Sequence, residues 1–293
     1  MTAARIFHAL HQGDRPFLLP NAWDIPSALL LADAGFPAVG TTSLGVNAAA
    51  GVPDSTGDGA ELAVALARQL APRLPVPLTM DLENGYHDDP SRVAALVEEL
   101  AGCGVAGVNL EDGRADGGLR APEEHAAVVG AVVAAAPELF VNARTDTYWL
   151  RTGADEGARY ADTVDRLTRY RDVGASGVFV PGLTDLDRIA AVADAVALPL
   201  NVLWSPGADL DALAAARVTR VSTGSALYRH ALAAALATAT AAGTGTPPPV
   251  SPVDYHQLQA RLGRRHGDPR RATTAGTSPQ PASARLSTGL PPG

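Results

Sequence analysis

The chain has 293 residues, a formal net charge of −8 and a pI near 5.3. This acidic balance argues against nucleic acid as a main partner. All 23 of its basic Lys+Arg residues are arginine. Chemistry that depends on a lysine side chain, such as Schiff-base catalysis, pyridoxal phosphate anchoring or a phosphate-loop lysine, is therefore excluded.

The cysteine content and the apolar runs indicate a cellular location. Cys103 is the single cysteine, so no intramolecular disulfide can form, which fits a reducing compartment. The N-terminus has no signal-peptide pattern, and no apolar run reaches membrane-spanning length without Gly, Pro or charge. We expect a cytoplasmic protein with no membrane partner.

Strand-like and helix-like segments alternate regularly along most of the chain. Apolar, strand-like runs occupy residues 17–21, 38–43, 77–82, 107–112, 140–146, 177–182, 200–204 and 220–223. Helical patterns lie at residues 25–34, 59–71, 90–102, 121–135, 154–173, 184–196, 208–215 and 225–242. This alternation predicts a (β/α)₈ (TIM) barrel, for which roughly 250 residues are typical.

An open, doubly wound α/β sheet is the alternative arrangement of these elements. Such a sheet usually binds its ligand at a glycine-rich turn after the first strand. The first predicted strand instead leads into Pro20-Asn21-Ala22-Trp23-Asp24. Polar residues also follow most of the other strands, which favours the barrel, and we assign it to residues 1–243.

The composition changes after the barrel. Residues 244–266 are expected to form a Thr/Gly/Pro-rich linker and a short amphipathic helix within 254–265. Residues 267–293 are rich in Pro, Ser, Thr, Gly and Arg, a composition typical of a disordered tail.

Acidic side chains end the third and fourth predicted strands, where a barrel of this type builds its site. Asp81 and Glu83 are two residues apart, so on a strand they point to the same side. Glu111 and Asp112 are adjacent, so only one of them can share the Asp81 side. Carboxylates from separate strands suit a hard cation such as Mg²⁺. Solvation at the barrel rim, a salt bridge or a helix cap is the structural alternative.

The fifth predicted strand carries Asn142, Arg144 and Asp146 on one face. An arginine in an acidic barrel mouth pairs with those acids or with an anionic ligand, and the two roles can coexist. Asn201, at the seventh strand, is a further candidate donor to a substrate carboxylate. A buried structural asparagine is the alternative for it.

Two more segments are candidates for substrate contact. The run Thr41-Thr42-Ser43-Leu44-Gly45 offers hydroxyl and backbone N–H groups that suit a carboxylate or phosphoryl oxygen, although an ordinary turn also explains it. Asp54, in the following loop, is more typical of a turn than of catalysis when it is considered alone. The seven histidines are scattered without a zinc-binding pair.

Together these segments resemble the isocitrate lyase / phosphoenolpyruvate mutase superfamily over roughly residues 15–242. The resemblance is carried by Pro20-Asn21-Ala22-Trp23-Asp24, Thr42-Ser43, Gly51-Val52-Pro53-Asp54, Asp81-Leu82-Glu83-Asn84-Gly85-Tyr86, Gly107-Val108-Asn109-Leu110-Glu111-Asp112 and Asn142-Ala143-Arg144-Thr145-Asp146. Each motif alone is a weak signal, whereas their order and spacing together are specific.

The resemblance implies a (β/α)₈ barrel and Mg²⁺-assisted chemistry next to a carboxylate-stabilised enolate. It implies that Asp81 contacts Mg²⁺ directly and that Arg144 binds the 2-oxo acid. Its remaining implied site residues are Asp54, Glu83 and Glu111 in the hydrated shell of the metal, and Ser43, Leu44 and Gly45 around the substrate carboxylate. It also implies a homo-oligomer, commonly a tetramer that exchanges its last helix.

The sequence departs from the family pattern at the acid/base loop. Classical isocitrate lyases carry a Lys-Lys-Cys-Gly-His loop, whereas the loop after Glu111 here is glycine-rich and lysine-free. The lysine of the mutase gating loop is also missing, so the chain fits a phosphonomutase-like branch. Tyr86, His87 and Arg114 are the candidate proton donors.

Three functions remain open from the sequence. The first is a Mg²⁺-dependent lyase that cleaves or forms a carbon–carbon bond next to the carboxylate of a small 2-oxo or 2-hydroxy acid. The second is a phosphonopyruvate mutase or hydrolase, in which Asp54 acts as nucleophile or orients water. The third is a non-catalytic barrel that binds a carboxylate metabolite.

Overall fold

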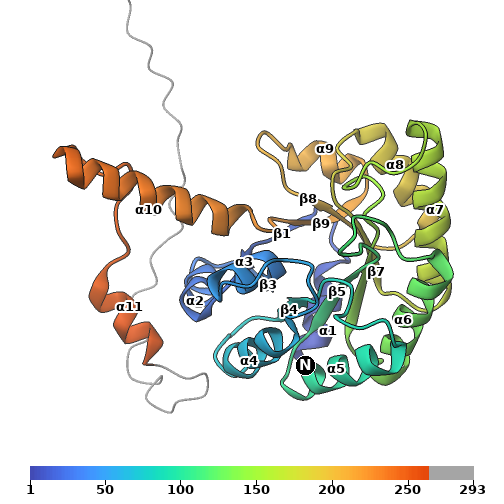
Figure 1. Ribbon diagram of the computed structural model, residues 1–293, viewed down its shortest axis with the longest axis horizontal. Helices are drawn as coiled ribbons and strands as arrows, with labels where there is room; N and C mark the ends of the chain where they lie inside the picture. The colour runs from blue at the N-terminus through green and yellow to red at the C-terminus, as the bar shows by residue number, and fades with distance from the viewer. Residues whose placement is uncertain (264–293) are drawn as a thin grey trace, which may run out of the picture.

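Parallel strands form a nearly closed barrel with helices around it (Figure 1). A computed structural model describes residues 1–263 of the chain, and within them the sheet has nine strands in the order β1-β9-β8-β7-β6-β5-β4-β3-β2. The strands are β1 Phe17–Leu19, β2 Asn21–Ala22, β3 Val39–Thr41, β4 Leu78–Asp81, β5 Gly107–Glu111, β6 Phe140–Arg144, β7 Gly177–Val180, β8 Leu200–Leu203 and β9 Val218–Ser222. The predicted TIM-barrel fold is confirmed.

The first predicted strand is divided at Pro20. The segment before it, β1, pairs with β9, and the segment after it, β2, pairs with β3. Proline has no N–H group to donate to a neighbouring strand, but the Pro20 carbonyl still accepts from the Gly40 N–H at 2.9 Å. The divided strand thus connects the two ends of the sheet.

Helices alternate with the strands and cover the outside of the barrel. Their bounds are α1 Ala3–Leu10, α2 Ile25–Asp33, α3 Ser43–Ala49, α4 Ala60–Leu70, α5 Pro90–Gly102, α6 Pro122–Ala135, α7 Glu156–Asp172, α8 Leu186–Val196, α9 Leu210–Ala215, α10 Ala226–Thr244 and α11 Tyr255–Leu262. An aspartate side chain caps the N-terminus of α2, α5, α7, α8, α9 and α11. Each such cap accepts from a first-turn N–H that would otherwise have no partner.

Two helices fall outside the sequence-based expectation. α1 precedes the barrel and buries Phe7, which lies edge-on to Phe140 of β6 at 5.5 Å between ring centroids. Both rings are almost inaccessible, at 0% and 1% exposure, and they form an aromatic floor at the N-terminal end of the strands. α3 begins at Ser43, where the sequence predicted the end of a strand followed by a loop.

The C-terminal helices leave the barrel. Figure 1 shows α10 projecting to the left as an arm, with α11 below it. Arg261 of α11 forms an ion pair with Asp33 of α2 at 2.7 Å, and Leu262 packs against the core. The tail predicted for residues 267–293 lies outside the described residues. No helix within the described part of the chain has the length and apolarity needed to cross a bilayer.

Candidate active site

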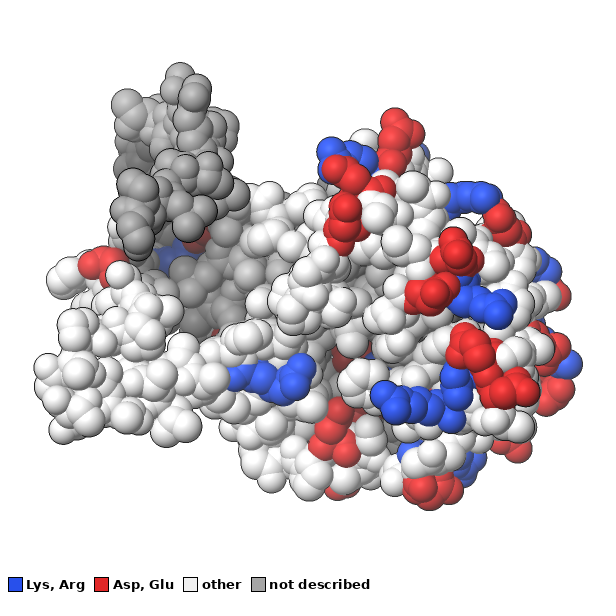
Figure 2. Space-filling view, turned by 90° about the horizontal axis from the view of Figure 1, so that it is seen from above, with Lys and Arg blue, Asp and Glu red and all other residues white. Residues whose placement is uncertain are grey.

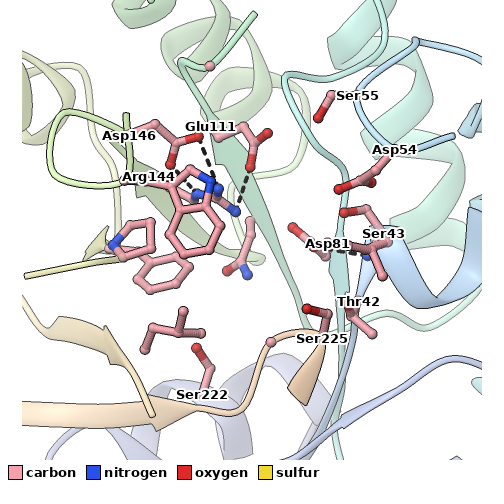
Figure 3. Close-up of a pocket in the computed structure, with 18 of the residues that line it drawn as sticks. Thr42, Ser43, Asp54, Ser55, Asp81, Glu111, Arg144, Asp146, Ser222 and Ser225 are labelled. Atoms are coloured by element: carbon pink, nitrogen blue, oxygen red, sulfur yellow. Dashed lines mark hydrogen bonds and ion pairs between the residues drawn. The ribbon is translucent and has the colours of Figure 1, made fainter. Parts of the chain in front are cut away.

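A cavity opens at the C-terminal ends of the strands, where barrels of this type carry their sites. Four carboxylates and two arginines line it: Asp54, Asp81, Glu111, Asp146, Arg114 and Arg144. Asn21, Thr42, Ser43, Leu44, Asn109, Ser222 and Ser225 also line it. Figure 3 shows Asp54, Asp81 and Ser43 on one side and Arg144, Glu111 and Asp146 on the other.

The β4 side presents the carboxylate of Asp81. One of its oxygens, Oδ2, accepts a 3.0 Å hydrogen bond from the Ser43 N–H, and the Asp81 N–H donates to Thr41 Oγ1 at 2.9 Å. Ser43 is the first residue of α3, so its N–H is one of the groups that a helix leaves unpaired. The short helix α3 therefore fixes the orientation of Asp81 within the cavity.

The β6 side is built around the guanidinium of Arg144. Strand register places Glu111 of β5 and Phe179 of β7 beside Arg144. Arg144 donates to both oxygens of Asp146 at 2.6 and 3.0 Å, and its Nη1 lies 2.6 Å from Glu111 Oε2. Burial acts to lower the pKa of Arg144, but the charges of Glu111 and Asp146 together outweigh it and raise that pKa, so Arg144 remains a cation.

The acids of the cavity influence each other's protonation. Burial, and then the Asp81 charge, raise the pKa of Asp54 above its ordinary value. Burial also raises the pKa of Glu111, and the Arg144 charge opposes that rise. A cation placed among these groups would relieve their repulsion.

Asp112 confirms the alternation expected at the end of β5. Glu111 lines the cavity, whereas Asp112 is fully buried on the opposite face. Its carboxylate accepts from Thr145 Oγ1, the Asp146 N–H, Arg166 Nη1 and the Tyr170 hydroxyl at 2.8 to 3.1 Å. Asp112 is thus a structural acid that ties β5 to the loop after β6 and to α7.

Glu83 does not share the cavity with Asp81 as the strand pattern suggested. β4 ends at Asp81, and Glu83 adopts a left-handed φ of 51°, so the alternation of a strand no longer applies. Its carboxylate is buried and accepts from Asn47 Nδ2 at 2.7 Å, and Glu83 is not among the residues that line the cavity. Burial and the Asp54 charge raise its pKa to about 7.

Three other predicted site residues lie outside the cavity lining. Tyr86 is 8% exposed and packs where a Cβ on Gly59 would approach its ring to 3.0 Å. Gly45 meets Trp23 and Tyr228, where a Cβ would come within 2.9 Å of the Trp23 side chain. Asn201 is buried and donates to Ser222 Oγ at 3.1 Å. In this structure Asn201 therefore contacts the lining without being part of it.

Asp54 lies in the cavity, whereas its loop position alone favoured a turn. The residues that sequence reasoning did not select include an apolar wall of the cavity, formed by Trp149, Leu150, Phe179, Pro181 and Leu203. No sequence motif marks the loops that carry several of these apolar residues. Arg114 enters from the loop between β5 and α6, which is folded back through a bridge between Gly113 and Leu119.

The acid set fits a hydrated Mg²⁺ rather than a metal enclosed by protein ligands. Within residues 1–263, no three Asp, Glu, His or Cys side chains lie close enough to enclose a metal ion by themselves. Mg²⁺ commonly keeps several waters and takes only one or two carboxylates directly. Asp81 is placed to supply one such ligand, and Asp54 and Glu111 line the same cavity.

Comparison with known proteins identifies the family. The family model described as phosphoenolpyruvate phosphomutase matches residues 7–242. The chain is 44% identical over 256 residues to Rv1998c of Mycobacterium tuberculosis H37Rv, covering 87% of this chain and 95% of that protein. It is 33% identical over 164 residues to an oxaloacetate decarboxylase of Paraburkholderia xenovorans LB400, covering 54% of each.

A solved structure agrees with these relatives. A Burkholderia cenocepacia J2315 protein assigned to the lyases or mutases is 36% identical, with a TM-score of 0.79, over 89% of this chain and 96% of that one. The matched region includes the whole barrel and every residue of the cavity. The chain therefore belongs to the phosphoenolpyruvate phosphomutase family, within the isocitrate lyase / phosphoenolpyruvate mutase superfamily.

Proposed function

We propose that this protein is a Mg²⁺-dependent lyase that cleaves or forms a carbon–carbon bond next to the carboxylate of a small 2-oxo or 2-hydroxy acid, by way of an enolate. The observation that carries the proposal is the placement of Asp81 and Arg144 in one cavity (Figure 3). A carboxylate suited to a hard cation and an arginine suited to a carboxylate are the two groups that such an acid requires.

Asp81 would hold the metal, with Asp54 and Glu111 accepting hydrogen bonds from its bound water. When bound, Mg²⁺ would supply positive charge at the 2-oxo oxygen, where an enolate develops negative charge. Arg144 would orient the substrate carboxylate, since Glu111 and Asp146 already hold its guanidinium in place. Pre-oriented donors of this kind avoid reorganisation during the reaction.

The N-terminus of α3 would bind a second substrate oxygen. The Ser43 N–H already donates to Asp81, which leaves the Leu44 N–H as the next unpaired donor at the cavity. The apolar side chains of Trp149, Phe179 and Leu203 would exclude water from the reacting carbon of the leaving fragment. Of Tyr86, His87 and Arg114, Arg114 is the one that lines the cavity, and its permanently charged guanidinium would supply charge stabilisation rather than a proton.

The test is turnover by the purified full-length chain with MgCl₂. Oxaloacetate, 2-methylisocitrate, isocitrate and phosphonopyruvate are offered in turn, and depletion of each is followed. We expect one of the carbon–carbon substrates to be consumed, EDTA to stop the reaction and Asp81→Asn to lower kcat/KM by at least about 100-fold.

Asp172→Asn is the matched control, because Asp172 is an exposed acid paired with Arg171 on the surface. It should leave kcat/KM unchanged. An equal rate with EDTA would reject the metal role. Binding of these acids without any turnover would favour a non-catalytic carboxylate-binding barrel.

Phosphorus–carbon chemistry is the second candidate. It is supported by the position of Asp54, which lines the cavity near Ser43 and Asp81, where a nucleophile or water-orienting carboxylate is needed. Release of phosphate, or formation of phosphoenolpyruvate, from phosphonopyruvate would select this function over carbon–carbon cleavage.

We also propose that the protein works in the cytoplasm as a homo-oligomer, with a tetramer as the expected state. The unpaired Cys103 supports a reducing compartment. The projecting arm α10 exposes Leu232 and Leu236, which supports association with other copies of the chain.

A further inference from the structure

Arg220 is a buried cation inside the barrel. It lies on β9, two residues before Ser222, so both side chains face the barrel interior and Arg220 lies deeper than the cavity lining. The residue is 0% exposed. Its guanidinium carbon lies 6.0 Å from the ring centroid of Phe7 and 5.9 Å from that of Phe140. Arg220 therefore separates the aromatic floor from the active-site cavity.

This charge has few protein partners. Among residues 1–263, no carboxylate lies within salt-bridge distance of Arg220, and its Nε and Nη1 atoms have no hydrogen-bond partner. Burial lowers its pKa to about 9, with the Asp81 charge opposing that shift, so the side chain stays charged at neutral pH. A buried cation without a counter-charge is destabilising, which calls for a functional reason.

Among residues 1–263, the one hydrogen bond made by the Arg220 side chain goes to a residue of the cavity. Its Nη2 donates to Asn109 Oδ1 at 2.9 Å, and the same oxygen accepts from Asn142 Nδ2 at 2.9 Å. A guanidinium has donors only, so it determines which end of the Asn109 amide faces it. The Asn109 oxygen must point down toward Arg220, and the NH₂ end must point away from it.

Asn109 lines the cavity between Asp81 and Asn142 in the strand register. Within the described part of the chain, no protein acceptor takes a hydrogen bond from Asn109 Nδ2. An oriented but unused N–H pair in a cavity lined by carboxylates is suited to a ligand oxygen that carries negative charge.

We propose that Arg220 is a positioning residue that locks the Asn109 amide with its N–H groups toward the cavity, where they donate to an anionic oxygen of the bound acid. This proposal depends on the proposed function only for the chemical class of the ligand, a small carboxylic acid. Oxalate, a small planar dianion, is the probe, because its binding does not require turnover.

The experiment measures the oxalate Kd by calorimetry with saturating MgCl₂, and Tm, for the full-length protein. We expect Asn109→Ala to weaken oxalate binding by about 10- to 100-fold, since it removes a hydrogen bond to a charged group. Arg220→Met should weaken binding without lowering Tm, because Met fills similar volume without an unpaired charge. Arg220→Lys should bind oxalate more tightly than Arg220→Met, because an ammonium still donates to Asn109 Oδ1.

The double variant tests whether Arg220 acts through Asn109. Asn109→Ala combined with Arg220→Met should bind oxalate no more weakly than Asn109→Ala alone, because the two changes remove the same interaction. Arg217→Met is the control, since Arg217 precedes the same strand but has a side chain 61% exposed. It should leave the Kd unchanged.

Several results would overturn the proposal. A lower Tm with an unchanged Kd in Arg220→Met assigns Arg220 a structural role only, and additive losses in the double variant separate it from Asn109. If Arg220→Met does not fold, an unchanged Kd in Asn109→Ala is sufficient to reject the idea. Failure of the wild-type protein to bind oxalate also overturns it. Oxalate binding without turnover of any acid overturns the proposed lyase function and leaves this inference standing.

Discussion

Glu83 holds a carboxylate where water has almost no access. It is 2% exposed, its Oε1 accepts from Asn47, and its Oε2 has no partner among the described residues. Burial and the charge of Asp54 therefore raise its pKa to about 7. The protonated form is favoured in the folded protein, whereas the unfolded chain has the ordinary value of 4.5.

This pKa predicts how the stability of the metal-free protein varies with pH. The folded state binds the extra proton between pH 4.5 and about 7, so the contribution of Glu83 to stability is full below the unfolded value. This contribution is lost as the pH rises through about 7, which lowers the free energy of unfolding by about 3 kcal/mol. Urea unfolding in EDTA at several pH values between 5 and 8 measures this decrease.

Glu83→Gln supplies the control for this pH dependence. The amide keeps the shape and can accept from Asn47, but it does not titrate. The decrease in stability between pH 5 and 8 should become shallower in the variant. The same slope in both proteins would assign the effect to other groups.

At the scale of secondary-structure elements, the buried carboxylate of Asp112 connects β5, β6 and α7. It joins the end of β5 to Tyr170 and Arg166 of α7 and to the Asp146 N–H after β6. Because Asp146 in turn holds Arg144, the network behind the barrel also fixes the arginine inside the cavity.

Removal of this acid should be among the most destabilising single changes. Asp112→Ala removes the buried acceptor shared by Arg166 and Tyr170 and leaves Arg166 only the partly exposed Asp162 as an ion-pair partner, so we expect a loss of about 3–5 kcal/mol in the free energy of unfolding. Asp172→Ala, which removes an exposed ion pair, should cost less than about 1 kcal/mol. Urea denaturation of both variants makes the comparison, and equal losses would contradict the structural role of Asp112.

The regular elements were predictable because each strand is an apolar run with a helix on either side. The helix from Pro90 to Gly102 matches its expected bounds, and other elements differ by a few residues. α1 was not anticipated, because its reason to form is the packing of Phe7 against Phe140, which is distant in sequence.

The site was predictable where it follows from strand ends. Asp81, Glu111 and Arg144 lie in the cavity because they end β4, β5 and β6. Glu83 and Tyr86 depend instead on left-handed backbone conformations after β4, with φ of 51° and 62°. The position of Asp54 depends on how a long loop folds over the barrel, and neither feature has a periodic signal in the sequence.

At the scale of the whole molecule, α10 is covered by little of the rest of the described chain. Residues 231–244 contain no charged side chain, and Figure 2 shows the projecting arm as largely white against the red and blue barrel surface. Leu232 and Leu236 on it are 54% and 70% exposed. An apolar arm of this kind is typical of a contact between copies.

We expect light scattering to give a mass that is a multiple of the 30.0 kDa chain, with four copies as the prediction. Changing Leu232 and Leu236 together to Glu should shift the protein to a smaller species. Leu186→Glu, at a leucine of α8 that is 42% exposed, should leave the mass unchanged. A wild-type monomer at micromolar concentration would contradict the assembly.

The aromatic floor of Phe7 and Phe140 has a consequence for the order of events in the barrel. Because it closes the N-terminal end of the barrel, small molecules enter and leave through the cavity at the C-terminal ends of the strands. An enzyme that cleaves one compound into two products must then release both products through this end, one after the other. The fragment that departs last competes with the incoming compound, so its accumulation slows further cycles.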